Sequence, residues 1–133
     1  MSGYLLDTHV VVWWLSNSRQ LSKEQRRVLG SIDQKGGRVQ MSAVTLLEIA
    51  ILYGVGNRKH QEKAQELIQF LEDHPLVEIV PLTPQVAVEV GTLGPSLVDP
   101  MDRAIVATAR VHRLTLITSD ERIIKSKLVR VIE

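Results

Sequence analysis

Short apolar segments alternate with helix-like segments along the whole of this 133-residue chain. Strands are predicted at residues 4–6, 38–41, 77–80 and 114–118, with a candidate edge strand at 129–132. Capping residues, glycines and prolines bound predicted helices at residues 8–15, 22–34, 43–53, 59–73, 84–93, 100–112 and 120–125. Mostly apolar strands separated by helices are typical of a parallel sheet that helices cover on both faces. The sequence therefore predicts one α/β domain over residues 1–133, with three α/β/α layers and a central, mainly parallel sheet of four or five strands.

Cysteine is absent from the sequence, which excludes disulfides, thiolate zinc sites and cysteine nucleophiles. No apolar run approaches the roughly 20 residues that a membrane span requires, and the longest run covers residues 10–15. No basic region precedes that run, and no small-residue cleavage site follows it. We therefore expect a cytoplasmic protein that makes no membrane contact.

Charge is distributed unevenly along the chain, although the net charge is only +1. Residues 110–133 contain six basic and three acidic side chains, which gives this segment a net charge of +3. A basic flank of this kind attracts phosphate groups, but solvated helix faces often carry similar runs. The asymmetry alone does not identify a partner.

Four of the fifteen acidic residues stand in unusual places, namely Asp7, Glu48, Asp102 and Asp120. Asp7 and Asp120 follow predicted strands and precede helices, so each could serve simply as an N-cap. Glu48 lies in a helix that is apolar nearly all round, which implies burial and a need for a partner. A salt bridge to an arginine such as Arg103 would satisfy that need.

The segment Asp99-Pro100-Met101-Asp102 is a helix-start signature in its own right. Asp99 is predicted at the N-cap, Pro100 at the first helical position and Asp102 at the third, in a position that resembles a capping box. For Asp99, capping is therefore the preferred interpretation.

The predicted fold nevertheless brings the four acids to one place. The carboxyl ends of parallel strands line one edge of the sheet, and ligands bind at that edge. Carboxylates that converge there would raise one another's pKa unless a cation lay among them. All-oxygen ligands favour Mg²⁺ or Mn²⁺ over zinc. Without these four charges the rest of the chain carries +5, as expected of a metal-dependent enzyme that acts on a phosphate backbone.

Four blocks of sequence, in order, resemble the motifs of PIN-domain ribonucleases, in particular the VapC-type toxins of toxin–antitoxin pairs. The blocks are Leu5-Leu6-Asp7-Thr8-His9 with Val12-Trp13-Trp14-Leu15; Ser42 to Ala50 around Glu48; Asp99-Pro100-Met101-Asp102-Arg103 with Ile105-Val106-Ala107; and Leu116-Ile117-Thr118-Ser119-Asp120. Some family members lack the acid of the fourth block. Together the blocks cover nearly the whole chain.

The resemblance implies hydrolysis of RNA phosphodiester bonds with Mg²⁺ or Mn²⁺. It implies that Asp7, Asp102 and Asp120 are metal ligands, and that Glu48 holds a second ion or a metal-bound water. Thr8 and Ser119 border the acids and are candidates for orienting a carboxylate or a ligand water, although local turn or cap hydrogen bonds explain them equally well.

Two further residues receive supporting roles in this interpretation. Asp99 is kept as a cap with a supporting role, and Arg103 is expected to pair with a neighbouring carboxylate rather than with RNA. Aromatic residues make up only 4% of the chain, so we expect RNA to be held by its backbone charge and shape.

The resemblance also implies partners. Family members typically form homodimers and are inhibited by a small antitoxin with a DNA-binding head and an extended tail. A side chain of that tail, such as an arginine, could enter the acidic site and displace the metal.

Three alternatives compete with the nuclease interpretation. A haloacid-dehalogenase-type phosphatase would need an acid two residues after Asp7, where His9 stands. A receiver-type signalling domain would need adjacent acids after the first strand and a lysine after the last, and the sequence has neither. The third alternative is a catalytically silent PIN-like module that binds RNA or protein, against which the presence of all four acids argues.

Overall fold

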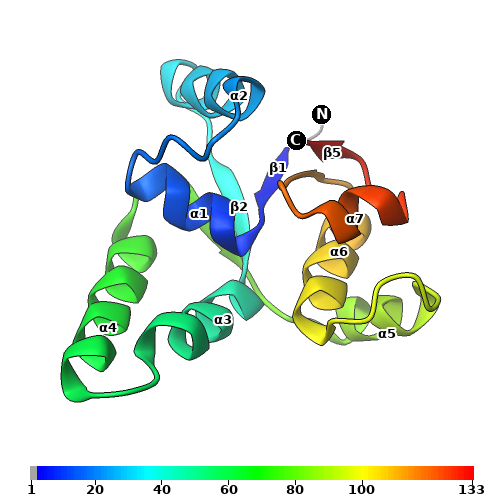
Figure 1. Cartoon of the computed structure of the whole chain (residues 1–133). Coiled ribbons are helices and arrows are strands. Elements are labelled where there is room, and N and C mark those ends of the chain that lie inside the picture. Colours follow the sequence, from blue (N-terminus) through cyan, green and yellow to red (C-terminus); the bar gives the residue numbers. More distant parts are fainter. Residues whose placement is uncertain (1–2) are drawn as a thin grey trace.

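A five-stranded parallel sheet organises the computed structural model, which describes residues 3–133 (Figure 1). Its strands are β1 (Tyr4–Leu6), β2 (Val39–Ser42), β3 (Val77–Val80), β4 (Thr115–Ile117) and β5 (Val131–Ile132). They lie in the order β3-β2-β1-β4-β5, and every neighbouring pair is parallel. The predicted fold class and the edge strand near the C-terminal end are therefore confirmed. Residues 1 and 2 of the predicted domain lie outside the described residues.

The helices that connect these strands begin and end close to the predicted positions. They are α1 (Thr8–Leu15), α2 (Lys23–Gln34), α3 (Ala43–Gly54), α4 (Arg58–Asp73), α5 (Pro84–Thr92), α6 (Pro100–His112) and α7 (Glu121–Ser126). Local chemistry explains the agreement. Ser22 and Gln25 form a complete capping box at α2, and Asp99 caps α6 directly before Pro100.

Two hydrophobic cores lie on opposite faces of the sheet. Leu6 belongs to the core beneath α1, α2, α3 and α4, whereas Leu5 belongs to the core beneath α5, α6 and α7. Successive side chains of a strand point to opposite faces, so this short central strand contributes to both cores. The arrangement establishes the three α/β/α layers (Figure 1).

Helix α3 departs from the sequence-based expectation of burial on nearly all sides. Ile49 is fully buried, but Leu47 is 52% exposed, Ile51 49% and Val55 73%. Leu47 and Ile51 lie four positions apart and therefore form a stripe on one face of the helix, and Val55 directly follows its end. An apolar helix in a small domain can also present a surface to another molecule, and composition alone does not separate these cases.

The strand order reverses between β4 and β1, the central strand of the sheet. From β1 the chain proceeds outward through β2 to β3, and then returns to the other side of β1 to form β4 and β5. Leu6 pairs with Ile117, so the next residues, Asp7 and Thr118, emerge side by side at the carboxyl edge. In open parallel sheets, ligands bind at such a reversal.

Within residues 3–133, no helix combines the length and the apolar character that crossing a membrane requires.

Candidate functional site

Asp7 occupies the point where the strand order reverses and is only 5% exposed. It is the N-cap of α1, and its Oδ1 accepts a hydrogen bond from the Thr8 amide at 2.8 Å. Its Oδ2 accepts from the Thr118 hydroxyl at 2.7 Å. Burial nevertheless raises the pKa of Asp7, with these two hydrogen bonds acting in the opposite direction. Asp7 is therefore both a cap and a buried carboxylate at the sheet edge.

Thr118 connects Asp7 to Asp120. Its hydroxyl donates to Asp7 and accepts from the Asp120 amide at 3.1 Å, so one buried side chain joins the ends of β1 and β4. Asp120 is the N-cap of α7, and its carboxylate accepts from the Arg122 amide at 2.9 Å. The exposed Arg122 guanidinium also lies 3.4 Å from the Asp120 carboxylate.

Glu48 reaches the same edge from the second turn of α3. Its carboxylate accepts a short hydrogen bond from the hydroxyl of Thr8, which also lies 3.2 Å from the hydroxyl of Thr45. Thr8 thus donates to two acids, through its hydroxyl to Glu48 and through its amide to Asp7. The salt bridge considered for Glu48 is not its observed interaction.

Asp102 is 7% exposed in the first turn of α6, where the N-cap Asp99 accepts hydrogen bonds from the Met101 and Asp102 amides. Burial first, and then the negative charges of Asp99, Asp120, Asp7 and Glu48, together raise the pKa of Asp102 to about 7. All four predicted acids therefore influence one another electrostatically at one edge of the sheet.

No basic side chain among residues 3–133 forms an ion pair with Asp7, Glu48 or Asp102. Three carboxylates at one edge, two of them buried, thus lack a compensating cation. The donor set consists of carboxylate and hydroxyl oxygens, which fits a hard divalent cation. Within the same part of the chain, no three Asp, Glu or His side chains lie close enough together to hold an ion as they stand. Coordination would therefore require side-chain rotation toward the ion.

Arg103 contradicts the expectation that it pairs with a carboxylate. Its guanidinium donates to the backbone carbonyl oxygens of Val90, Gly94 and Leu97. Arg103 therefore fastens the last turn of α5 and the segment between α5 and α6. The prediction of a carboxylate partner was wrong because a guanidinium has five donors and binds a cluster of carbonyl oxygens as well as a carboxylate.

Gln25 and Ser119 form a hydrogen bond between α2 and the residue before Asp120, which was not predicted from the sequence. Gln25 is fully buried, accepts from the Ser22 amide at 3.0 Å and donates to the Ser119 hydroxyl at 3.0 Å. Ser119 therefore contacts α2 rather than a carboxylate. The Ser22–Gln25 capping spacing could have indicated the first contact, but the second joins residues 94 positions apart.

The family model of the PIN domain matches residues 4–127 of the chain. The chain belongs to the PIN-domain family. Ribonuclease VapC22 of Mycobacterium tuberculosis is 33% identical over 130 residues, which cover 92% of this chain and 91% of that protein.

Two solved structures are similar to this chain in fold. FitAcB from Neisseria gonorrhoeae is 26% identical with a TM-score of 0.70, and the match covers 98% of this chain and 96% of that one. A toxin–antitoxin complex from Klebsiella pneumoniae shares the fold at 19% identity and a TM-score of 0.64, with 98% of this chain and 97% of that one covered.

Proposed function

We propose that this PIN-domain protein is a Mg²⁺- or Mn²⁺-dependent endoribonuclease that acts as the toxin of a toxin–antitoxin pair. The observation that carries the proposal is the group of carboxylates at the reversal of the strand order. Asp7 and Asp102 are buried there without a basic partner, and Glu48 and Asp120 lie at the same edge. The relative named Ribonuclease VapC22 supports RNA as the substrate.

In this proposal, Asp7, Asp102 and Asp120 are the metal ligands, and Glu48 serves a second ion or orients a water. A divalent ion held there would lower the pKa of a water molecule and offset charge on the departing oxygen of the phosphodiester. The chain itself positions the ligands: Thr118 fixes one oxygen of Asp7, and Thr8 fixes one oxygen of Glu48. Because its pKa is about 7, the Asp102 carboxyl is about half protonated at neutral pH without a cation, and a bound cation would displace this proton.

The proposed protein partner is a small antitoxin. The similarity of this chain to the ribonuclease VapC22 and to a chain of the Klebsiella toxin–antitoxin complex supports such a partner. An antitoxin that places an arginine in the acidic site would supply the basic partner that Asp7, Glu48 and Asp102 lack. A complex with full nuclease activity would contradict this mode of inhibition.

A homodimer is the proposed assembly of the toxin itself. The exposed stripe of Leu47 and Ile51 on α3, with the exposed Val55 directly after the helix, supports it, because apolar faces of this kind are commonly buried between subunits.

The test of the nuclease proposal is cleavage of a 5′-labelled pool of structured RNA by the purified protein. Reactions contain Mg²⁺, Mn²⁺ or EDTA, and Asp7→Asn is compared with Asp73→Asn, which changes an exposed acid on α4. We expect metal-dependent cleavage that Asp7→Asn abolishes and Asp73→Asn preserves. Cleavage in EDTA, or equal cleavage by both variants, would contradict the proposal.

One observation favours a second candidate, a catalytically silent module that binds RNA. The carboxylates of residues 3–133 are not already gathered at ligand distance. Retained RNA binding without Mn²⁺ binding would support this candidate against the nuclease.

A further inference from the structure

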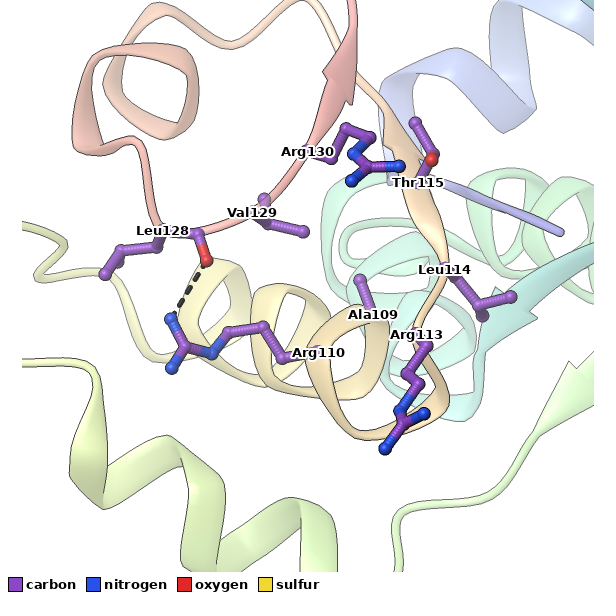
Figure 2. Close-up of a pocket in the computed structure, with 8 residues that line it drawn as sticks. All are labelled: Ala109, Arg110, Arg113, Leu114, Thr115, Leu128, Val129 and Arg130. Carbon is purple, nitrogen blue, oxygen red and sulfur yellow. Dashed lines mark hydrogen bonds between the residues drawn. The ribbon is translucent and has the colours of Figure 1, made fainter. Parts of the chain in front are cut away.

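A cavity lined by three arginines lies beside the end of α6 and the start of β4 (Figure 2). The acids lie at the opposite ends of these two elements, because Asp102 is in the first turn of α6 and Asp120 follows β4. It has a volume of about 480 Å³ and opens between the end of α6, the start of β4 and the segment that leads into β5. Its lining residues are Ala109, Arg110, Arg113, Leu114, Thr115, Leu128, Val129 and Arg130. No acidic residue belongs to this lining.

Two of the three arginines are free to bind a ligand. Arg110 is occupied, because its guanidinium pairs with Glu89 at 2.6 Å and donates to the Leu128 carbonyl oxygen at 2.9 Å. The side chains of Arg113 and Arg130 are exposed and, among residues 3–133, form neither an ion pair nor a hydrogen bond with another side chain. The cavity therefore retains two uncompensated positive charges.

The backbone that carries these two arginines is fixed. Arg113 ends α6 in the left-handed conformation, with φ of 55°, and its amide bonds back to the last turn of the helix. The Arg130 carbonyl oxygen accepts from the Leu116 amide at 2.9 Å, which ties this segment to β4. Figure 2 shows Arg113 at the end of the helix and Arg130 on the segment opposite, with the two guanidinium groups directed apart, so the two cations border the cavity at separate points.

The remaining lining suits a nucleotide. Guanidinium groups bind phosphate oxygens through paired hydrogen bonds, and the Thr115 hydroxyl adds a further donor or acceptor. Ala109, Leu128 and Val129 provide an apolar wall for a sugar or base. The volume lies within the range of small-ligand sites and exceeds what a phosphate group alone would fill.

We propose that this cavity, the arginine cavity, binds a phosphodiester unit of the RNA substrate at a distance from the site of cleavage. The inference rests on the proposed nuclease function and narrows its substrate class. Asp102 and Arg113, the C-cap of α6, lie eleven positions apart, or about 16 Å along the helix axis. Only an RNA that contacts both ends of the molecule, through its length or its folded shape, would use both sites.

The first test measures binding in EDTA, where no cleavage is needed. The probe is a fluorescent single-stranded RNA of about 20 nucleotides, and the variant is Arg113→Asn/Arg130→Gln, because asparagine tolerates the left-handed conformation at 113. The control Arg58→Gln/Lys59→Gln removes the same charge from the exposed start of α4. We expect the cavity variant to weaken binding about tenfold and to reduce the slope of log Kd against log salt by about 1.4, since each phosphate contact in a single strand contributes about 0.7.

The control should bind within about twofold of the wild type. Arg113→Lys/Arg130→Lys should restore the salt slope, because lysine keeps the charge while losing the paired geometry. Binding by the cavity variant equal to that of the wild type, or an equal loss in the control, would overturn the proposal.

The second test separates this site from the nuclease itself. In Mn²⁺, the cavity variant should cleave a substrate of about 4 nucleotides as the wild type does, while its kcat/KM for the long RNA falls about tenfold. If Asp7→Asn abolishes cleavage but the cavity variant cuts both RNAs normally, the nuclease stands and the arginine cavity is refuted. If no RNA is cut but binding still depends on Arg113 and Arg130, the nuclease proposal fails and the cavity stands.

Discussion

A single buried hydroxyl, that of Thr118, holds two of the candidate ligands in register. It donates to Asp7 and accepts from the amide of Asp120, so both of its main hydrogen-bonding capacities are used. Replacing it with valine keeps the shape of the side chain and leaves the Asp7 oxygen without its donor. We expect Thr118→Val to lower the free energy of unfolding by about 1–2 kcal/mol and to reduce RNA cleavage.

Thr108→Val is the matched control for this change. Thr108 is also buried, and its hydroxyl donates to the Ala104 carbonyl oxygen within α6, away from the acids. Urea unfolding and cleavage kinetics should show that both variants change stability, whereas only Thr118→Val changes cleavage. Unchanged cleavage by folded Thr118→Val would remove the threonine from the site.

Asp102 makes the stability of the metal-free protein depend on pH. Its pKa is about 7 in the folded protein against 3.8 ordinarily, so the folded state holds a proton that the unfolded state releases between these values. The resulting stabilisation is complete below about pH 4 and is lost as the pH rises through 7. In EDTA, we therefore expect Asp102→Asn to be more stable than the wild type at pH 8, by about 1–2 kcal/mol, and to show a flatter pH dependence.

Chemical denaturation at pH 5 and pH 8 checks this expectation. Asp33→Asn, which alters an exposed acid on α2, should follow the wild type at both values. A lower stability of Asp102→Asn at pH 8 would show that the ionised carboxylate has a stabilising partner in solution.

At the scale of elements, Arg103 determines how the segment before α6 is held. Its guanidinium binds carbonyl oxygens of Val90, Gly94 and Leu97, which otherwise have no common partner. We expect Arg103→Gln to lower the free energy of unfolding by about 2–3 kcal/mol, because hydrogen bonds to a charged group are lost. Hydrogen exchange should accelerate most in residues 90–99. Arg58→Gln, at the exposed start of α4, should leave the exchange of that segment unchanged.

Helix α3 offers a prediction about assembly. If its exposed stripe is the homodimer surface, Ile51→Arg should yield a monomer by light scattering, because a charge would be buried against an apolar partner surface. Leu82→Arg introduces the same charge at another exposed apolar position and should leave the mass unchanged. A dimer that persists in Ile51→Arg would place the interface elsewhere.

Helix boundaries were predictable from the sequence, whereas several contacts between elements were not. Caps and prolines determine where helices begin, so the boundaries of α2 and α6 were predictable from local residues such as Ser22, Asp99 and Pro100. The convergence of the acids followed from the rule for the carboxyl ends of parallel strands. The partner of Arg103, the exposed side of α3 and the contact between Gln25 and Ser119 depend on tertiary packing, which no local pattern encodes.

At the scale of the whole molecule, charge is separated along the direction of the strands. Carboxylates collect at the carboxyl edge of the sheet, and the arginine cavity lies at the amino edge, with α6 spanning the two. The same chain thus combines repulsion between carboxylates at one end, which a cation would relieve, with positive charge at the other end, which would attract phosphate. This separation explains why the net charge of +1 conveyed so little about the partner.

Relief of that repulsion should be visible in the stability of the entire domain. An ion that binds only the folded state stabilises it by about 2.7 kcal/mol at one hundred times its dissociation constant. For a chain of 133 residues this corresponds to a rise in Tm of about 10 °C. We expect Mn²⁺ to raise the Tm of the wild type at pH 8 by this amount, and EDTA to reverse the rise.

Asp7→Asn and Asp102→Asn should each lose most of the shift, since each removes a proposed ligand, whereas Asp73→Asn should keep it. In EDTA at pH 8, the Tm of Asp102→Asn should exceed that of the wild type, because the ionised carboxylate destabilises the fold when no ion is bound. A carboxylate that destabilises the metal-free fold and is required for the Mn²⁺ shift is acting as a ligand rather than as a cap. Equal Mn²⁺ shifts in all four proteins would instead place the ion outside this edge of the sheet.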